Sequence, residues 1–241
     1  MKLPGFGAWA LLPLVLMGAA RGAEVPPIYS GLSGKVMLDN ARVRVEKFVL
    51  APGASTGRHS YPADQLVVFV KGGTLKSMDS GRSVLWKDGR VRWHSAGEPS
   101  NGGSTNVGTA PIEMIWVTVK PVPAGAASQD YPEGPPHDYH LNYPNIPGED
   151  LLENERVVVQ RFVVNPEQWE GVHAHLPNML YIHIKGGQWA AHLKGQPEHL
   201  YPQPSPDGSV GWMDVYKISQ GHESGNKGKE PIDLIWVTLK D

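Results

Sequence analysis

Histidines are the residues of this chain whose spacing most clearly suggests chemistry, and they gather in GVHAHLPNMLYIHIKGG, residues 171–187. One residue separates His173 from His175, so in an extended strand both imidazoles would point to the same side. Another histidine, His222, follows much later in the chain. Three neutral imidazoles can hold one divalent transition metal and leave positions open for water or substrate. We therefore predict a metal site at these three residues; the alternative is a set of core histidines without metal.

Tyr181 and His183 follow in the same stretch and alternate in phase with Met179. Residues with this spacing share one face of a strand. A histidine on a buried face needs a hydrogen-bonding partner, so His183 could be a pocket base, a replacement ligand or a satisfied core residue. We predict Tyr181 and His183 as candidate catalytic residues. Glu170 and Glu223 flank the motif as further acids, and the sequence does not place them.

The chain contains an internal repeat. Residues 38–73 align without a gap on residues 152–187, with 14 of 36 positions identical. The segments 111–120 and 231–240 share 7 of 10 positions. Residues 121–150 lie between the copies and are rich in Pro and Gly, which is typical of a linker. The predicted parts are a signal peptide (1–23), a first barrel (24–120), a linker (121–150, with solvated His137 and His140) and a second barrel (151–241).

Each copy has the pattern of β-strands. Val43 and Val45 alternate with charged residues, which predicts strands with one buried face. The dipeptides Gly72-Gly73, Asp88-Gly89 and Asp207-Gly208 stand between apolar runs, where two-residue hairpin turns require positive φ. Beyond the N-terminal segment no stretch has helical periodicity. The chain is therefore predicted to be all-β, with two modules that close into barrels.

These motifs resemble those of the cupins, and the duplication resembles a two-barrel bicupin. The first cupin motif has a glycine, a His-x-His pair, a glutamate and a glycine at fixed spacing. The second has a histidine and an asparagine, followed by Gly and Pro. In the first copy the residues at these positions are Gly53, His59, Tyr61, Gln65, Gly72, Gly102, Asn106, Gly108 and Pro111, with Tyr61, Gln65 and Gly102 in place of the second histidine, the glutamate and the late histidine. The second matches with His173, His175, Met179, Gly186, His222, Asn226, Gly228 and Pro231, and with Glu167 where the leading glycine would stand. The resemblance implies two tandem jelly-roll-like barrels.

In the cupins the two motif histidines, the glutamate and the late histidine bind a divalent metal. The first copy retains only His59 of these four residues. The second copy retains all three histidines and has Met179 in place of the glutamate. The resemblance therefore implies a divalent transition metal, namely Fe, Cu, Ni, Mn or Zn, in the C-terminal barrel only. It also implies that Met179, Tyr181 and His183 face the barrel interior.

Two main functions follow from the resemblance. One is a metal-dependent, dioxygenase-like oxidoreductase that acts on a small molecule. The alternative is a non-catalytic binding protein for a carbohydrate or small metabolite, since Tyr61, Trp169 and Tyr181 would suit stacking on a sugar. A paralogue that has lost activity and serves as an assembly partner is a third reading. Bicupins can associate through barrel edges, so the resemblance allows a homo-oligomer.

The N-terminal sequence MKLPGFGAWALLPLVLMGAARGAEVPP has one Lys, an apolar run from Ala8 to Met17 and then small residues. This is the layout of a secretory signal peptide, and the apolar run is too short for a membrane anchor. We expect cleavage between Ala20 and Ala23 and export to the periplasm or the extracellular space. The net charge of -2 does not indicate nucleic acid as a partner, and no other segment predicts membrane insertion. The chain has no Cys, so disulfides and thiolate ligands are excluded.

Overall fold

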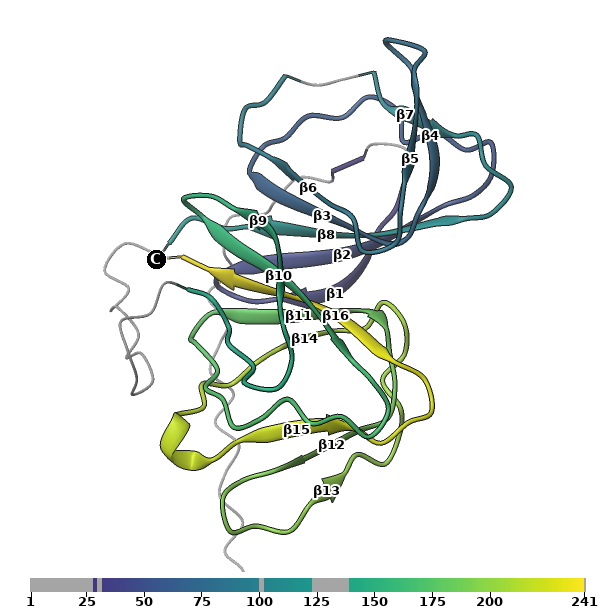
Figure 1. Cartoon of the computed structure of the whole chain (residues 1–241). Helices are drawn as coiled ribbons and strands as arrows, with labels where there is room; N and C mark the ends of the chain where they lie inside the picture. Colours follow the sequence, from purple (N-terminus) through teal and green to yellow (C-terminus); the bar gives the residue numbers. More distant parts are fainter. Residues whose placement is uncertain (1–27, 30–31, 100–101, 123–138, 241) are drawn as a thin grey trace, which may run out of the picture.

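The computed structural model describes residues 28–29, 32–99, 102–122 and 139–240. It confirms the all-β class and the two tandem jelly-roll barrels, each made of a five-stranded and a three-stranded sheet (Figure 1). The predicted signal peptide and His137 lie outside the described residues. In those ranges the one helical element is the 3-10 helix η1 (Ile218–Gln220), and no helix there is long and apolar enough to cross a membrane.

The N-terminal barrel has a five-stranded sheet in the order β1-β2-β8-β3-β6 and a three-stranded sheet in the order β5-β4-β7. All its strand pairs are antiparallel. The strands are β1 (Lys35–Asp39), β2 (Val43–Leu50), β3 (Asp64–Lys71), β4 (Gly73–Ser77), β5 (Ser83–Trp86), β6 (Val91–His94), β7 (Ser104–Asn106) and β8 (Ile112–Val119).

The C-terminal barrel repeats this topology, with sheets β9-β10-β16-β11-β14 and β13-β12-β15. The repeat seen in the sequence is therefore a repeat of the whole barrel. Its strands are β9 (Glu149–Glu153), β10 (Val157–Val164), β11 (Met179–Lys185), β12 (Trp189–His192), β13 (His199–Leu200), β14 (Val210–Trp212), β15 (Glu223–Asn226) and β16 (Ile232–Leu239).

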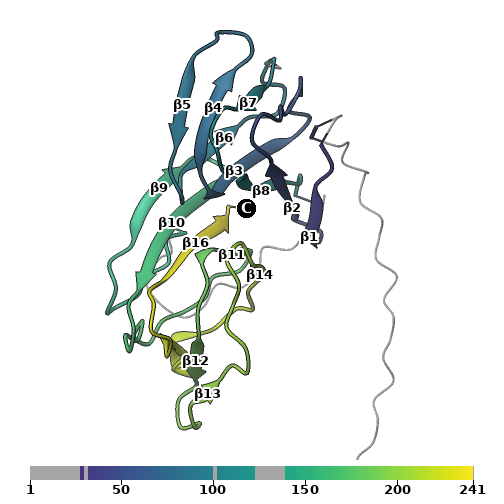
Figure 2. The same ribbon diagram turned by 90° about the vertical axis from the view of Figure 1, so that its right-hand side faces the viewer.

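The two five-stranded sheets pack on each other between the barrels (Figures 1 and 2). Val43 and Val45 of β2 belong to this shared core, together with Leu180 and Val237 of the other barrel. Phe48 of β2 points the opposite way, into the interior of its own barrel. The expectation that alternation buries one face of a strand is therefore wrong for these sheets. Both faces are buried, because the second barrel covers the outer face.

The Gly72-Gly73 pair is not a two-residue hairpin, because β3 and β4 belong to different sheets. Gly72 does not have a positive φ, and a Cβ there would collide with the backbone carbonyl of Trp86. Glycine is therefore required by close backbone approach. The positive φ predicted for Gly89 and Gly208 is confirmed, at 75° and 70°. Their turns also join strands of different sheets rather than hairpin partners.

Residues 139–148, which composition groups with the linker, contact the C-terminal barrel. Leu141, Tyr143 and Ile146 are buried in the interior core of this barrel, where Tyr143 packs on Phe162. The half-buried His140 lies 3.7 Å from Asp150. Isolated apolar residues among many Pro and polar neighbours give no strand periodicity, so the sequence pattern did not indicate this packing.

Candidate metal centre in the C-terminal barrel

The three predicted histidines come together from two segments of the C-terminal barrel. His173 and His175 lie on the extended segment between β10 and β11, which forms isolated antiparallel bridges rather than a continuous strand. His173 pairs with His222, and its backbone N–H donates to the His222 carbonyl at 3.1 Å. His222 directly follows Gly221, whose left-handed φ of 60° ends η1. The expected approach of the late histidine from a distant segment is confirmed.

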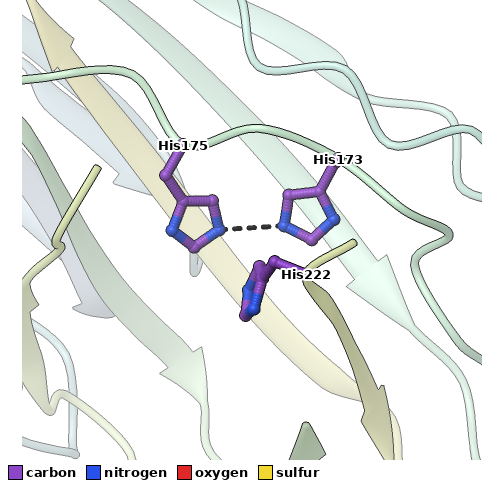
Figure 3. A group of neighbouring side chains, drawn as sticks. All are labelled: His173, His175 and His222. Carbon is purple, nitrogen blue, oxygen red and sulfur yellow. Dashed lines mark hydrogen bonds between the residues drawn. The ribbon is translucent and has the colours of Figure 1, made fainter. Parts of the chain in front are cut away.

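The three rings lie around one point (Figure 3). Each ring offers one nitrogen atom, and these three nitrogen atoms lie within 4.8 Å of one another. All three side chains are buried. His173 Nε2 lies 2.8 Å from His175 Nε2, and His173 Nδ1 lies 2.8 Å from the Gly171 carbonyl. When His173 Nδ1–H donates to that carbonyl, the lone pair of Nε2 is directed at the centre. Metal-binding histidines are commonly oriented by a second bond of this kind.

The electrostatics also favour ligand histidines. Burial lowers the pKa of His173 and His222 to about 4 and lowers the pKa of His175 well below its usual value. All three rings are therefore neutral near pH 7, the form that binds metal. Three buried neutral imidazoles within reach of one point are a suitable donor set for a divalent transition metal.

Met179 stands at the position of the family glutamate, and its sulfur has a backbone partner. Its Sδ accepts the Leu176 backbone N–H at 3.1 Å. The side chain is fully buried in an apolar cluster with Phe162, Leu176 and Ile232. The thioether sulfur therefore already accepts a hydrogen bond from the backbone.

A cavity of about 190 Å³ adjoins the His175 ring. Tyr181 and His183 line it, as the alternation predicted, while Met179 on the same face packs in the core. The other lining residues are Tyr143, Glu170, Trp189, Tyr201, Gln203, Ser205, Met213, Ser224, Leu234 and Trp236. The walls are thus mainly aromatic, with a few amide, hydroxyl and carboxyl groups.

The ring nitrogens of His183 both have protein partners. Trp189 donates its Nε1–H to His183 Nε2 at 3.0 Å, so Nδ1 carries the proton and donates to Ser209 Oγ at 2.9 Å. Burial also lowers the pKa of His183 to about 4. Of the readings that the sequence left open, this geometry matches a satisfied core histidine. The catalytic roles of His183 and Tyr181 stay predictions.

The sequence could not place the two flanking acids, and the structure separates them. Glu170 is buried, lines the cavity and has its Oε2 3.9 Å from His173 Nε2. Burial raises the pKa of Glu170 to about 8, although hydrogen bonds from Tyr143 and Ser224 act in the opposite direction. Glu223 instead accepts the Gly171 backbone N–H at 3.1 Å and lies 3.3 Å from His192. The signal for Glu170 in the sequence was only its nearness to His173.

The N-terminal barrel has a different interior. His59 Nε2 lies 2.9 Å from the Tyr61 hydroxyl, and Tyr61 stacks on His94 with ring centroids 4.0 Å apart. Gly102, where the late histidine would stand, donates its backbone N–H to Asp79. His59, Tyr61 and His94 line a cavity of about 140 Å³, together with Trp116. Within the described part of this barrel, no group of three metal-ligating side chains comes together.

The chain was compared with known proteins. A scan of family models found no match, and neither did a search of curated protein sequences. Among solved structures, an oxalate decarboxylase in complex with formate from Lactobacillus farciminis is 13% identical, with 91% of this chain and 88% of that chain covered and a TM-score of 0.53. A salicylate 1,2-dioxygenase from Pseudaminobacter salicylatoxidans is 9% identical over 88% and 77%, with a TM-score of 0.51. A cupin 2 conserved barrel domain protein from Leptotrichia buccalis is 9% identical over 90% and 92%, with a TM-score of 0.50. At these identities the likeness concerns the fold alone.

Proposed function

Starting from the two-barrel cupin fold that its topology and its structural neighbours show, we propose that this chain is a metal-dependent enzyme acting in its C-terminal barrel. In this proposal His173, His175 and His222 bind one divalent transition metal, drawn from Fe, Cu, Ni, Mn and Zn. With a redox-active ion of this list, that is any of them except Zn, the reaction would be a dioxygenase-like oxidation, in which dioxygen oxidises a small molecule in the adjoining cavity. The observation that carries the proposal is the convergence of three buried, neutral imidazoles beside that cavity.

The chain's own residues would bind and shield the substrate. A bound metal of this kind supplies Lewis-acid or redox chemistry. Trp189, Leu234 and Trp236 give apolar walls that exclude water, and Gln203 and Ser205 offer hydrogen bonds that would orient a polar substrate. Among the described residues, neither Lys nor Arg lines the cavity, so no side-chain cation there would pair with an anionic group of the substrate. The volume is below the roughly 300 Å³ at which drug-sized pockets begin, so the substrate is small.

Metal content tests the proposal directly. Purified protein, reconstituted in turn with each candidate metal, is expected to retain about one equivalent per chain by elemental analysis. His175→Ala should lose this metal, because it removes a central ligand. His59→Ala is the matched control in the other barrel and should retain it. Equal metal content in all three proteins, or none in the wild type, would contradict the proposal. Oxygen consumption with a panel of small organic molecules then tests the reaction class.

A non-catalytic binding protein is the second candidate, and the aromatic walls favour it. Of the three residues predicted to stack on a sugar, Tyr181 lines the C-terminal cavity, Tyr61 is buried in the other barrel, and Trp169 packs over Gly225 and His192. Calorimetry with neutral sugars separates the two candidates. Binding by chelator-treated protein without any turnover would favour the second.

Export is part of the proposal and depends on the N-terminal sequence alone. We propose that residues 1–23 direct the chain to the periplasm or the extracellular space. Mass spectrometry of the protein from its native host should find a mature N-terminus between residues 21 and 24. An intact Met1 on protein retained in the cytoplasm would contradict export.

A further inference from the structure

We infer that Glu170 supplies the carboxylate ligand of the C-terminal metal site, in place of the acid that the family pattern has at Met179. The inference rests on the proposed metal site and deepens it. It changes the expected ligand set from three histidines to three histidines and one carboxylate. This change bears on which metals the site prefers, because carboxylate oxygens favour harder ions than imidazoles do.

The position of Glu170 is the first observation. Its Oε2 lies 3.9 Å from His173 Nε2. Two ligand atoms, each about 2.1 Å from one metal ion, can be at most about 4.2 Å apart, so this spacing is compatible with a shared ion. Glu170 sits on the same extended segment as His173 and lines the same cavity as His175. The carboxyl group therefore lies beside His173. Among the described residues, the potential ligand atoms that lie within 4.8 Å of one another are those of the three histidines, so the Glu170 side chain would turn toward the rings to join them.

The second observation is an unsatisfied buried oxygen. Glu170 is 1% exposed, and its Oε2 makes no hydrogen bond. Tyr143 and Ser224 hydrogen-bond to the carboxyl group and hold it in place. A buried carboxylate oxygen without a partner is costly unless a cation or a donor meets it. The oxygen that lacks a partner is the one that lies near His173 Nε2, where a metal would supply the missing contact.

The comparison between the two copies is independent of that geometry. In the ungapped alignment Glu170 corresponds to Thr56. The backbone agrees, because Thr56 N–H donates to the Ser104 carbonyl as Glu170 N–H donates to the Ser224 carbonyl. A buried carboxylate thus occurs at this position in the copy with three histidines, and a hydroxyl occurs in the copy with one. A metal ion in the C-terminal barrel would explain why this copy buries an acidic side chain at this position.

Met179 does not compete for this role. Its sulfur accepts the Leu176 backbone N–H, and its side chain packs in the apolar core. The acid of the family pattern is therefore replaced by a core residue, and the carboxylate comes from the segment that precedes the histidine pair.

Metal titrations of the chain without the predicted signal peptide test the inference. The variants are Glu170→Gln, which keeps the shape, and Glu170→Thr, which installs the residue of the first copy. Glu167→Gln is the matched control, because it makes the same change at an exposed side chain that lies 3.6 Å from Lys227. The measurements are Mn²⁺ and Zn²⁺ affinity by calorimetry and the visible absorption of the Co²⁺ form. Circular dichroism checks that each variant is folded, and Glu170→Thr carries the test if Glu170→Gln does not fold.

We expect both Glu170 variants to weaken Mn²⁺ binding at least about 10-fold, with a smaller effect on Zn²⁺ and a changed Co²⁺ spectrum. Glu167→Gln should match the wild type in all three measurements. If the Glu170 variants keep wild-type Mn²⁺ affinity and an unchanged Co²⁺ spectrum, the inference is overturned while the three-histidine site stands. If the wild type binds none of these three metals and also none of Fe, Cu and Ni, the proposed function fails, and the inference fails with it.

Discussion

His183 shows how a single side chain can look catalytic in the sequence and be held as a structural residue in the fold. Its two ring nitrogens bond to Trp189 and Ser209. In the first copy the equivalent residue is Phe69, which stacks on Trp86 with ring centroids 4.6 Å apart. Both rings neighbour a tryptophan, but the two tryptophans belong to non-equivalent strands, Trp86 to β5 and Trp189 to β12.

We therefore predict that His183→Phe lowers the free energy of unfolding by about 1–3 kcal/mol, since the Trp189 Nε1–H loses its acceptor. Metal affinity should not change. Urea denaturation and metal titration check the two parts. A loss of turnover of about 100-fold or more with unchanged stability would instead support the catalytic role predicted from the sequence.

Met179 supports a second prediction for a single residue. Met179→Leu conserves volume in the apolar core, so it should cost less than about 1.5 kcal/mol of stability, part of it from the lost Leu176 N–H contact. Because the thioether has a backbone partner, metal affinity should stay at the wild-type value. Thermal melts and titrations on the same samples measure both. A clear drop in affinity for soft metals would identify the sulfur as a ligand.

At the level of elements, the Gly-Gly pairs mark the corners where the chain passes from one sheet to the other. A Cβ at Gly186 would collide with the backbone carbonyl of Ser205, as one at Gly72 would with Trp86. We predict that Gly186→Ala destabilises the protein by about 1–3 kcal/mol through overpacking, because a backbone group cannot rotate away. Gly195→Ala is the control: its φ is 74° but its Cβ would meet open space, so only backbone strain of about 1 kcal/mol is expected. Equal effects of the two substitutions on urea denaturation would contradict this account.

At the level of the whole molecule, the two barrels share one apolar core along their five-stranded sheets. Unfolding one barrel would expose the outer face of the other, so we predict a single cooperative thermal transition. Val117→Asp places a carboxylate in the shared core from the N-terminal side and should lower the melting temperature of both barrels together. Scanning calorimetry measures this. Two resolved transitions, with only one of them shifted, would show that the barrels unfold independently.

The buried titratable groups give a pH dependence for the whole metal-free protein. Burial lowers the pKa of His173, His183 and His222 from 6.5 to about 4, so the unfolded chain binds more protons between these values. Stability from these groups is present above pH 6.5 and is lost as the pH falls toward 4. Glu170 acts oppositely: burial raises its pKa from 4.5 to about 8, so its contribution is lost as the pH rises through 8.

Burial also lowers the pKa of His175, so below pH 6.5 several histidines act against Glu170, and above pH 6.5 Glu170 acts alone. We therefore predict maximal stability near pH 6.5. Melting temperatures of chelator-treated protein across the pH range check this. His183→Phe should flatten the acid side of the curve, because it removes one of the histidines whose pKa burial lowers. A melting temperature that rises as the pH falls below 6.5 would contradict the sign worked out here.

Much of the fold could be predicted from local patterns. The repeat indicated two similar modules, the alternation indicated strands, and the spacing of His173 and His175 indicated two rings on one side. The shared face of Met179, Tyr181 and His183 also followed from period-two geometry. These predictions hold because they depend on neighbours in the chain.

Tertiary structure decided the rest, because it depends on which distant residues meet. The alternating valines of β2 (Val43–Leu50) showed that one face is apolar, but only the packed barrels showed that this face meets the other barrel. The sequence placed Glu170 next to the histidine pair without showing its environment. In the fold this carboxyl group is buried and is hydrogen-bonded by Tyr143 and Ser224, which come from segments on either side of the motif, and its other oxygen is left unsatisfied beside His173. A residue's type and spacing are local properties, whereas its solvation and its partners are properties of the fold.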